Sequence, residues 1–293
     1  MSDSGPDGPF QLRDARTDAK GFAELANLYG HARNQKGALG VVDCSGVQWI
    51  DGNLACALAA INHLLYSESR RRLHLSRMKP SLKALLTEAG LFGKASIPNR
   101  PSIVPIKHFT MTDSRAFAGY TQDHLTKSRL PAMSDAVAKR VFEGIDEIFN
   151  NFVIHSQSRE GLYAGGQFFP RRSRLEFSLA DMGIGIPRVV EQALESNFSA
   201  PEAIEWAMSD RNTTRSGDVP GGLGLKILRE FIEKNGGAMS VVSGAGFWSS
   251  SPKGVERVEM VNPFPGTVVT IEVDTSDPKR YQLDYEIDPS AVF

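Results

Sequence analysis

The segment from Ser134 to Ser156 constrains this chain most strongly, because its apolar residues recur at helical spacing. Ser134 is a favourable N-cap residue, and a single apolar stripe follows it: Val137, Val141, Ile145, Ile148 and Phe152. Glu147 and Asn151 are four residues apart, so a carboxylate lies over a carboxamide on one helix face. An amide oxygen can bind a hard cation, and a carboxylate beside it can orient a water molecule. The segment predicts a long amphipathic helix that carries a polar functional pair.

Two later segments are rich in glycine and lie where an expected strand ends or an expected helix begins. Asp181 precedes Gly183 and Gly185, so a flat base could approach the backbone while the carboxylate accepts a hydrogen bond from an exocyclic amine. The other segment opens a helix, whose backbone N–H groups attract phosphate, and it contains Gly221, Gly222, Leu223, Gly224 and Leu225. Each motif alone also fits a tight turn or a flexible loop. Their combination favours a nucleotide pocket.

Two more features belong to the same expected pocket. The polar segment 209–219 contains Arg211 and Arg215, and it is expected either to cover the phosphates as a lid or to be an ordinary flexible loop. Thr267 begins the last strong strand, where its hydroxyl could support Asp181 or a bound water molecule. A β-branched residue that simply starts a strand is the alternative for Thr267.

The composition excludes several classes of protein. The chain has 293 residues, 41% of them hydrophobic, which is enough for two modest domains. Its net charge is −1, so no overall charge favours nucleic acid or an anionic membrane. No apolar run approaches the roughly 20 residues of a membrane span, and residues 1–9 do not resemble a signal peptide. We expect a cytoplasmic protein with no nucleic-acid or membrane partner.

The two cysteines and the one basic cluster have simple expected roles. Cys44 and Cys56 lie in apolar surroundings and are expected to be buried thiols rather than a disulfide or a metal site. Arg70, Arg71 and Arg72 are expected to form a solvated loop between a helix and a strand.

The pattern of expected elements indicates an α+β chain with two domains. We divide it into an N-terminal segment at 1–34, disordered up to about residue 12 and then helical, and a small α/β domain at 35–105. A linker at 106–130 and a second domain at 131–293 follow. The small domain alternates strand and helix, which implies a sheet covered by helices, with elements at 39–43, 54–65, 73–75 and 80–90.

The second domain places helices beside a mostly antiparallel sheet, which indicates a two-layer α+β sandwich. After the long helix, its elements are expected at 162–169, 175–180, 187 onward, 225–236, 239–242 and 268–273. Residues 244–262 contain Phe247 and Trp248 in a setting rich in glycine and serine. The pattern leaves open whether they form a hairpin or a binding surface.

The motifs Glu-x-x-x-Asn, Asp-x-Gly-x-Gly, Gly-Leu-Gly-Leu and Gly-Thr, in this order, resemble those of the GHKL ATPase family, which includes histidine kinases, gyrase and the anti-sigma-factor kinases. The resemblance covers roughly residues 131–275 and implies a Bergerat sandwich that binds ATP with Mg²⁺. It implies that Asn151 holds the metal and that Glu147 is the catalytic residue that activates water. It also implies nucleotide contacts by Asn151, His155, Asp181, Gly183, Gly185, Gly222, Leu223, Gly224, Leu225 and Thr267.

Three positions leave the phosphate contacts open. Ile154 stands where kinase-type members of the family usually carry a basic residue, and Pro220 replaces the first glycine of the phosphate-binding motif. His155 is expected either to contact phosphate or to close its helix by a hydrogen bond. The residues that could replace the missing basic contact are Arg211, Arg215 and Lys226.

Residues 36–95 resemble a STAS domain, the fold of the anti-sigma-factor antagonists, through segments 41–54 and 85–91. Regulated members carry a serine just after the aspartate that matches Asp51. Gly52 and Asn53 stand there instead, and neither can accept a phosphoryl group. A docking or dimerisation module is therefore expected rather than a phosphorylation switch. Any small α/β domain with a buried helix is the alternative.

These expectations lead to one principal function and two alternatives. The principal one is a Mg-ATP-binding GHKL-type ATPase that acts as a nucleotide-dependent switch through a protein partner or a second copy of the chain. A serine/threonine protein kinase of the anti-sigma-factor type is the first alternative. A non-catalytic adaptor that binds nucleotide is the second. The expected cofactors are ATP and Mg²⁺.

Overall fold

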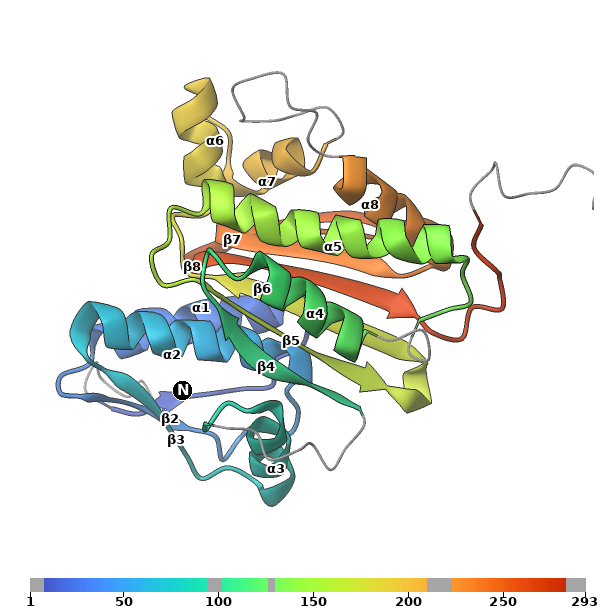
Figure 1. Ribbon diagram of the computed structural model, residues 1–293. Coiled ribbons are helices and arrows are strands. Elements are labelled where there is room, and N and C mark those ends of the chain that lie inside the picture. Colours follow the sequence, from blue (N-terminus) through green and yellow to red (C-terminus); the bar gives the residue numbers. More distant parts are fainter. Residues whose placement is uncertain (1–7, 94–101, 126–129, 210–222, 283–293) are drawn as a thin grey trace, which may run out of the picture.

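The computed structural model describes residues 8–93, 102–125, 130–209 and 223–282. The chain mixes helices with two sheets, one of three parallel strands and one of five antiparallel strands. In Figure 1 the helices α1 (Ala19–Asn34) and α2 (Ala55–Ser69) lie between the two sheets. The helix α5 (Asp135–His155) lies on the opposite face of the larger sheet.

The N-terminal part forms the smaller sheet in the order β1-β2-β3. Besides α1 and α2, the N-terminal part contains β1 (Phe10–Gln11), β2 (Leu39–Asp43), the 3₁₀ turn η1 (Gly52–Leu54), β3 (Arg72–Ser76) and α3 (Pro80–Ala89). The strands and helices expected between 39 and 90 are confirmed. The expectation of disorder up to about residue 12 is wrong for β1, which pairs with β2.

Arg71 corrects the expectation for the basic cluster. Its side chain is only 8% exposed, because its guanidinium donates to the backbone carbonyls of Ala32 and Arg33, both at 2.9 Å, and of Gly37 at 3.0 Å. These carbonyls lie in and just after the last turn of α1, where backbone acceptors lack intrahelical partners. Arg71 therefore closes a helix from inside the protein and does not belong to a solvated loop.

The larger sheet has the order β4-β5-β6-β8-β7. Its strands are β4 (Ile103–Phe109), β5 (Leu162–Phe169), β6 (Arg174–Asp181), β7 (Ala238–Ser251) and β8 (Gly254–Asp274). The remaining helices are α4 (Ser114–His124), α6 (Ile186–Leu194), α7 (Ala200–Met208) and α8 (Leu223–Asn235). Much of the segment expected as a linker is thus regular structure, since it contains α4 and the end of β4.

The long helix α5 follows its sequence pattern closely. The side chain of Ser134 accepts a hydrogen bond from the backbone N–H of Val137 at 3.2 Å, as the N-cap prediction requires. All five residues of the expected apolar stripe are buried. Each such side chain contributes roughly 1.5–3 kcal/mol when it leaves water. Helix α4 extends this packing, since the Phe117 ring stacks on Phe149 with centroids 4.6 Å apart.

Strands β7 and β8 form one long hairpin that includes residues 244–262. Phe247 and Trp248 are 1% and 3% exposed, so neither offers an aromatic surface to a partner. The Phe247 and Phe264 rings lie 6.1 Å and 6.2 Å from the Phe22 ring of α1. The hairpin thus packs on the N-terminal part of the chain.

Helices cover both faces of the larger sheet. Helices α4, α5 and α8 lie on one face, and α1 and α2 cover the other. Two hydrogen bonds fix the start of α2 on this sheet. The backbone N–H of Gly52 donates to Oε1 of Gln167 at 2.7 Å, and Nδ2 of Asn53 donates to Oγ of Ser178 at 3.0 Å. A Cβ on Gly52 would lie 2.4 Å from Oε1 of Gln167, so glycine permits this close approach.

A pair of acidic side chains lies in the same interface. Glu176 is 6% exposed and accepts a hydrogen bond from Oγ1 of Thr17 at 3.0 Å, while Asp51 accepts one from the backbone N–H of Thr17 at 2.9 Å. Burial raises the pKa of Glu176 to about 8, and the negative charges of Asp51 and Glu272 act in the same direction. Glu176 is therefore largely protonated at neutral pH.

Both cysteines are free and buried, as expected. Burial raises the pKa of Cys44 to about 11 and that of Cys56 to about 12, which makes both thiols unreactive. Within the described ranges, none of the helices combines the length and the apolar character needed to cross a bilayer.

Glu176→Gln is expected to stabilise the protein at alkaline pH. As pH rises from about 4.5 to 8, the unfolded chain loses this proton before the folded chain does, so the free energy of unfolding falls over that window. The penalty reaches the order of 5 kcal/mol, and a neutral amide of the same shape removes it. Denaturant titrations should show a gain at pH 8.5 and little change at pH 5. Glu256→Gln, on the exposed part of the hairpin, is the control, and an equal gain in both variants would contradict this account.

Candidate functional site

Helix α5 contacts two other predicted motifs, the turn after β6 at its C-terminal end and the start of α8 about two turns earlier. The backbone N–H of Ile184, in the turn after β6, donates to the carbonyl of Ser156, the residue that ends α5, at 2.9 Å. Helices α5 and α8 pack side by side above the sheet (Figure 1). The fold therefore brings three separate parts of the sequence to one region.

Glu147 makes the most informative contact of the site. Its Oε2 accepts a hydrogen bond from the backbone N–H of Leu225 at 3.0 Å, although the two residues are 78 positions apart. Asn151 is half-buried one turn further along α5, and His155 is the last residue of that helix. The acidic and amide pair of α5 is thus placed beside the beginning of α8.

The phosphate-binding motif is described only in part. Gly221 and Gly222 lie outside the described residues, as do residues 210–219 of the expected lid. Leu223 and Gly224 are the first two residues of α8, and Leu225 is the third.

Asp181 ends β6 and is 1% exposed. Burial raises the pKa of its carboxyl group to about 7, while hydrogen bonds from the backbone N–H groups of Gly183 and Thr267 lower it. The bond from Gly183 to Oδ1 measures 2.5 Å. A buried carboxyl that titrates near neutrality, at the end of a strand, is a frequent property of functional sites.

A small network of hydroxyl groups supports the turn after Asp181. Oγ of Ser243 lies 2.8 Å from Oγ1 of Thr267 and accepts a hydrogen bond from the backbone N–H of Ile186, also at 2.8 Å. Thr267 therefore makes two contacts. Its hydroxyl group is hydrogen-bonded to Ser243, and its backbone N–H donates to the carboxyl group of Asp181. Sequence reasoning missed Ser243, since β7 contains five serines and their spacing does not single one out.

Packing within the chain accounts for both glycines of the Asp181 motif. A Cβ on Gly183 would lie 2.1 Å from the carbonyl oxygen of Ser156. Gly185 has φ +83°, a conformation that side chains rarely adopt, and its Cβ would lie 3.0 Å from Oγ of Ser243. The two glycines hold the turn against α5 and β7.

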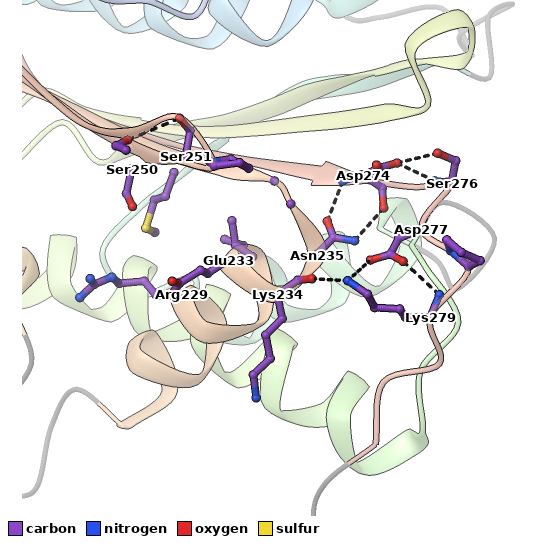
Figure 2. Close-up of a pocket in the computed structure, with 17 residues that line it drawn as sticks. Arg229, Glu233, Lys234, Asn235, Ser250, Ser251, Asp274, Ser276, Asp277 and Lys279 are labelled. Atoms are coloured by element: carbon purple, nitrogen blue, oxygen red, sulfur yellow. Dashed lines mark hydrogen bonds and ion pairs between the residues drawn. The ribbon is translucent and has the colours of Figure 1, made fainter.

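A cavity of about 660 Å³ lies elsewhere, between the end of α8, the β7–β8 hairpin and residues 274–279 (Figure 2). Some of its polar groups are paired with one another. Asn235 and the backbone of Asp274 exchange two hydrogen bonds of 2.9 and 2.7 Å, and Nζ of Lys279 donates to the carbonyl of Lys234 at 3.1 Å. None of the predicted site residues lines this cavity. The cavity lies at the C-terminal end of α8.

No model of a known protein family matches this chain, and no curated protein sequence matches it either. The function is therefore inferred from the residues and their geometry.

Gly183→Ala is expected to lower the free energy of unfolding by roughly 2 kcal/mol or more, because the new methyl group meets a backbone carbonyl that cannot move freely. Thermal denaturation measures this loss. Gly119→Ala is the matched control, since nothing lies within 4 Å of its Cβ position and alanine favours the helix. If both variants melted like the original chain, the turn after Asp181 would not pack as described.

Proposed function

We propose that this chain is a Mg-ATP-binding ATPase of the GHKL type that acts as a nucleotide-dependent switch. The contact between Glu147 and Leu225 carries the proposal. It places a carboxylate, with Asn151 one turn away, beside the first turn of a helix that follows a glycine-rich segment. A helix N-terminus attracts phosphate, and the carboxylate is then positioned to orient a water molecule.

The adenine end of the proposed site is Asp181. Its buried carboxyl group is held by two backbone N–H groups and retains acceptor capacity for an exocyclic amine. Gly183 and Gly185 follow it and carry no side chain that could compete with a flat base. This combination supports an adenine nucleotide as the ligand.

Magnesium fits a site with few protein ligands. Among the described residues, no group of three or more His, Cys, Asp and Glu side chains is arranged to hold a metal ion. Mg²⁺ typically takes one or two protein ligands together with substrate phosphates. Asn151 would hold the ion, which supplies charge neutralisation for the triphosphate.

The proposal assigns the phosphoryl group to water rather than to the N-terminal part of this chain. Gly52 and Asn53 occupy the position at which a STAS-like module would accept it. Neither has a hydroxyl group, and both are buried against the larger sheet.

An external protein or a second copy of the chain is part of the proposal. Exposed apolar side chains are found on α5, α6 and the loop that follows α6, with Ile154, Leu194 and Phe198 exposed by 52%, 42% and 45%. A hydrogen bond of 3.5 Å between Gln157 and Gln192 joins the ends of the two helices. This apolar surface lies next to the C-terminal end of the helix that carries Glu147 and Asn151, which supports partner contact there.

Calorimetry with Mg-ATP is expected to show binding that Asp181→Asn weakens at least tenfold, because the charged acceptor is lost. The affinity of the original chain should fall as pH drops below about 7, where Asp181 becomes protonated, and the variant should not show this dependence. Asp123→Asn, on the exposed surface of α4, is the control. Absence of Mg-ATP binding by the original chain would remove both enzymatic interpretations, the ATPase and the protein kinase.

Glu147→Gln is expected to lose ATP hydrolysis by 10²-fold or more while keeping ATP affinity, because an amide cannot accept the proton of the attacking water. Phosphate release and ATP binding, measured on the same preparation, test this separation. Hydrolysis at an undiminished rate would show that Glu147 is not the base.

A further inference from the structure

We propose that Glu147 has a second role, as a positioning residue that holds the first turn of α8 in place before nucleotide binds. This inference deepens the proposed function. Only its consequence for ATP affinity depends on that function being correct. The contact itself is formed within the chain.

The backbone of α8 explains why an external acceptor matters. The first four N–H groups of a helix have no acceptor within the helix. Leu225 is the third residue of α8, so its N–H is one of these four, and Oε2 of Glu147 accepts it at 3.0 Å. A carboxylate is also favourable there because the N-terminus is the positive end of the helix dipole. Glu147 thus acts as an N-terminal cap supplied by another helix.

The rest of α8 is anchored independently of Glu147. Leu228, Phe231 and Ile232 are buried in the core that α8 shares with α5 and the sheet. At the other end, the backbone N–H of Gly237 closes the helix on the carbonyl of Ile232 at 3.0 Å, and Asn235 is bonded to Asp274. By contrast, Leu225 is only partly buried and Lys226 is exposed. Loss of the acceptor oxygen at position 147 should therefore loosen the first turn and leave the remaining turns in place.

The two roles of Glu147 make different demands on its side chain. A cap requires an acceptor oxygen, which glutamine also provides, whereas a base requires a carboxylate. Alanine provides neither. Comparison of Glu147→Gln with Glu147→Ala therefore separates positioning from base catalysis.

Hydrogen exchange of the full chain without nucleotide tests the positioning role. Glu147→Ala should speed exchange of peptides from residues 223–230 by about fivefold, the change that corresponds to loss of a typical helix cap. Glu147→Gln should exchange like the original chain. Glu143→Ala, one turn earlier on α5 where the side chain pairs with Arg140, is the matched control. Exchange in β6 serves as an internal check that each variant is folded.

A second measurement relates the cap to the nucleotide. Mg-ATP should bind Glu147→Ala about fivefold more weakly than Glu147→Gln, because the first turn of α8 must be ordered during binding. If alanine and glutamine give the same exchange in the nucleotide-free chain, the positioning role is wrong even if ATP binds. If ATP fails to bind the original chain, the proposed function is wrong, and the exchange result still decides the positioning role.

Discussion

Burial of both faces of the five-stranded sheet is the constraint on which the structure depends. Helices α4, α5 and α8 cover one face, and α1 and α2 cover the other. A sheet buried on both sides must satisfy its polar side chains internally. Ser178 shows how this is done, because its hydroxyl meets Asn53 from η1 at 3.0 Å and Thr270 from β8 at 2.7 Å. The position of the candidate site follows from this layered packing, which fixes where α5 ends relative to β6.

Features that depend on local sequence were predictable. The stripe of α5 and its cap at Ser134 specify a helix without reference to the rest of the chain, because spacing and capping act within a few residues. Pro80 and Gly90 mark the two ends of α3 for the same reason. The residue types at Glu147 and Asp181 also indicated polar chemistry before any contact was known.

Features that depend on distant partners were not predictable. Nothing near Arg71 in the sequence shows that its guanidinium meets the last carbonyls of α1. Nothing local shows that Phe247 packs on α1 while Trp248 belongs to the core on the other face of the sheet. At the site, the motif order suggested proximity, but the bond from Leu225 to Glu147 and the contribution of Ser243 depend on how strands and helices pack.

The docking of Gly52 and Asn53 has a consequence for competition between molecules. The chain itself holds this end of the N-terminal part against the sheet, so the contact is intramolecular. A tethered segment behaves as if it were present at an effective concentration that reaches the millimolar range for short connections. A free protein that recognised the same end of α2 would have to displace a permanently attached competitor, and at cellular abundance only a much tighter binder would succeed.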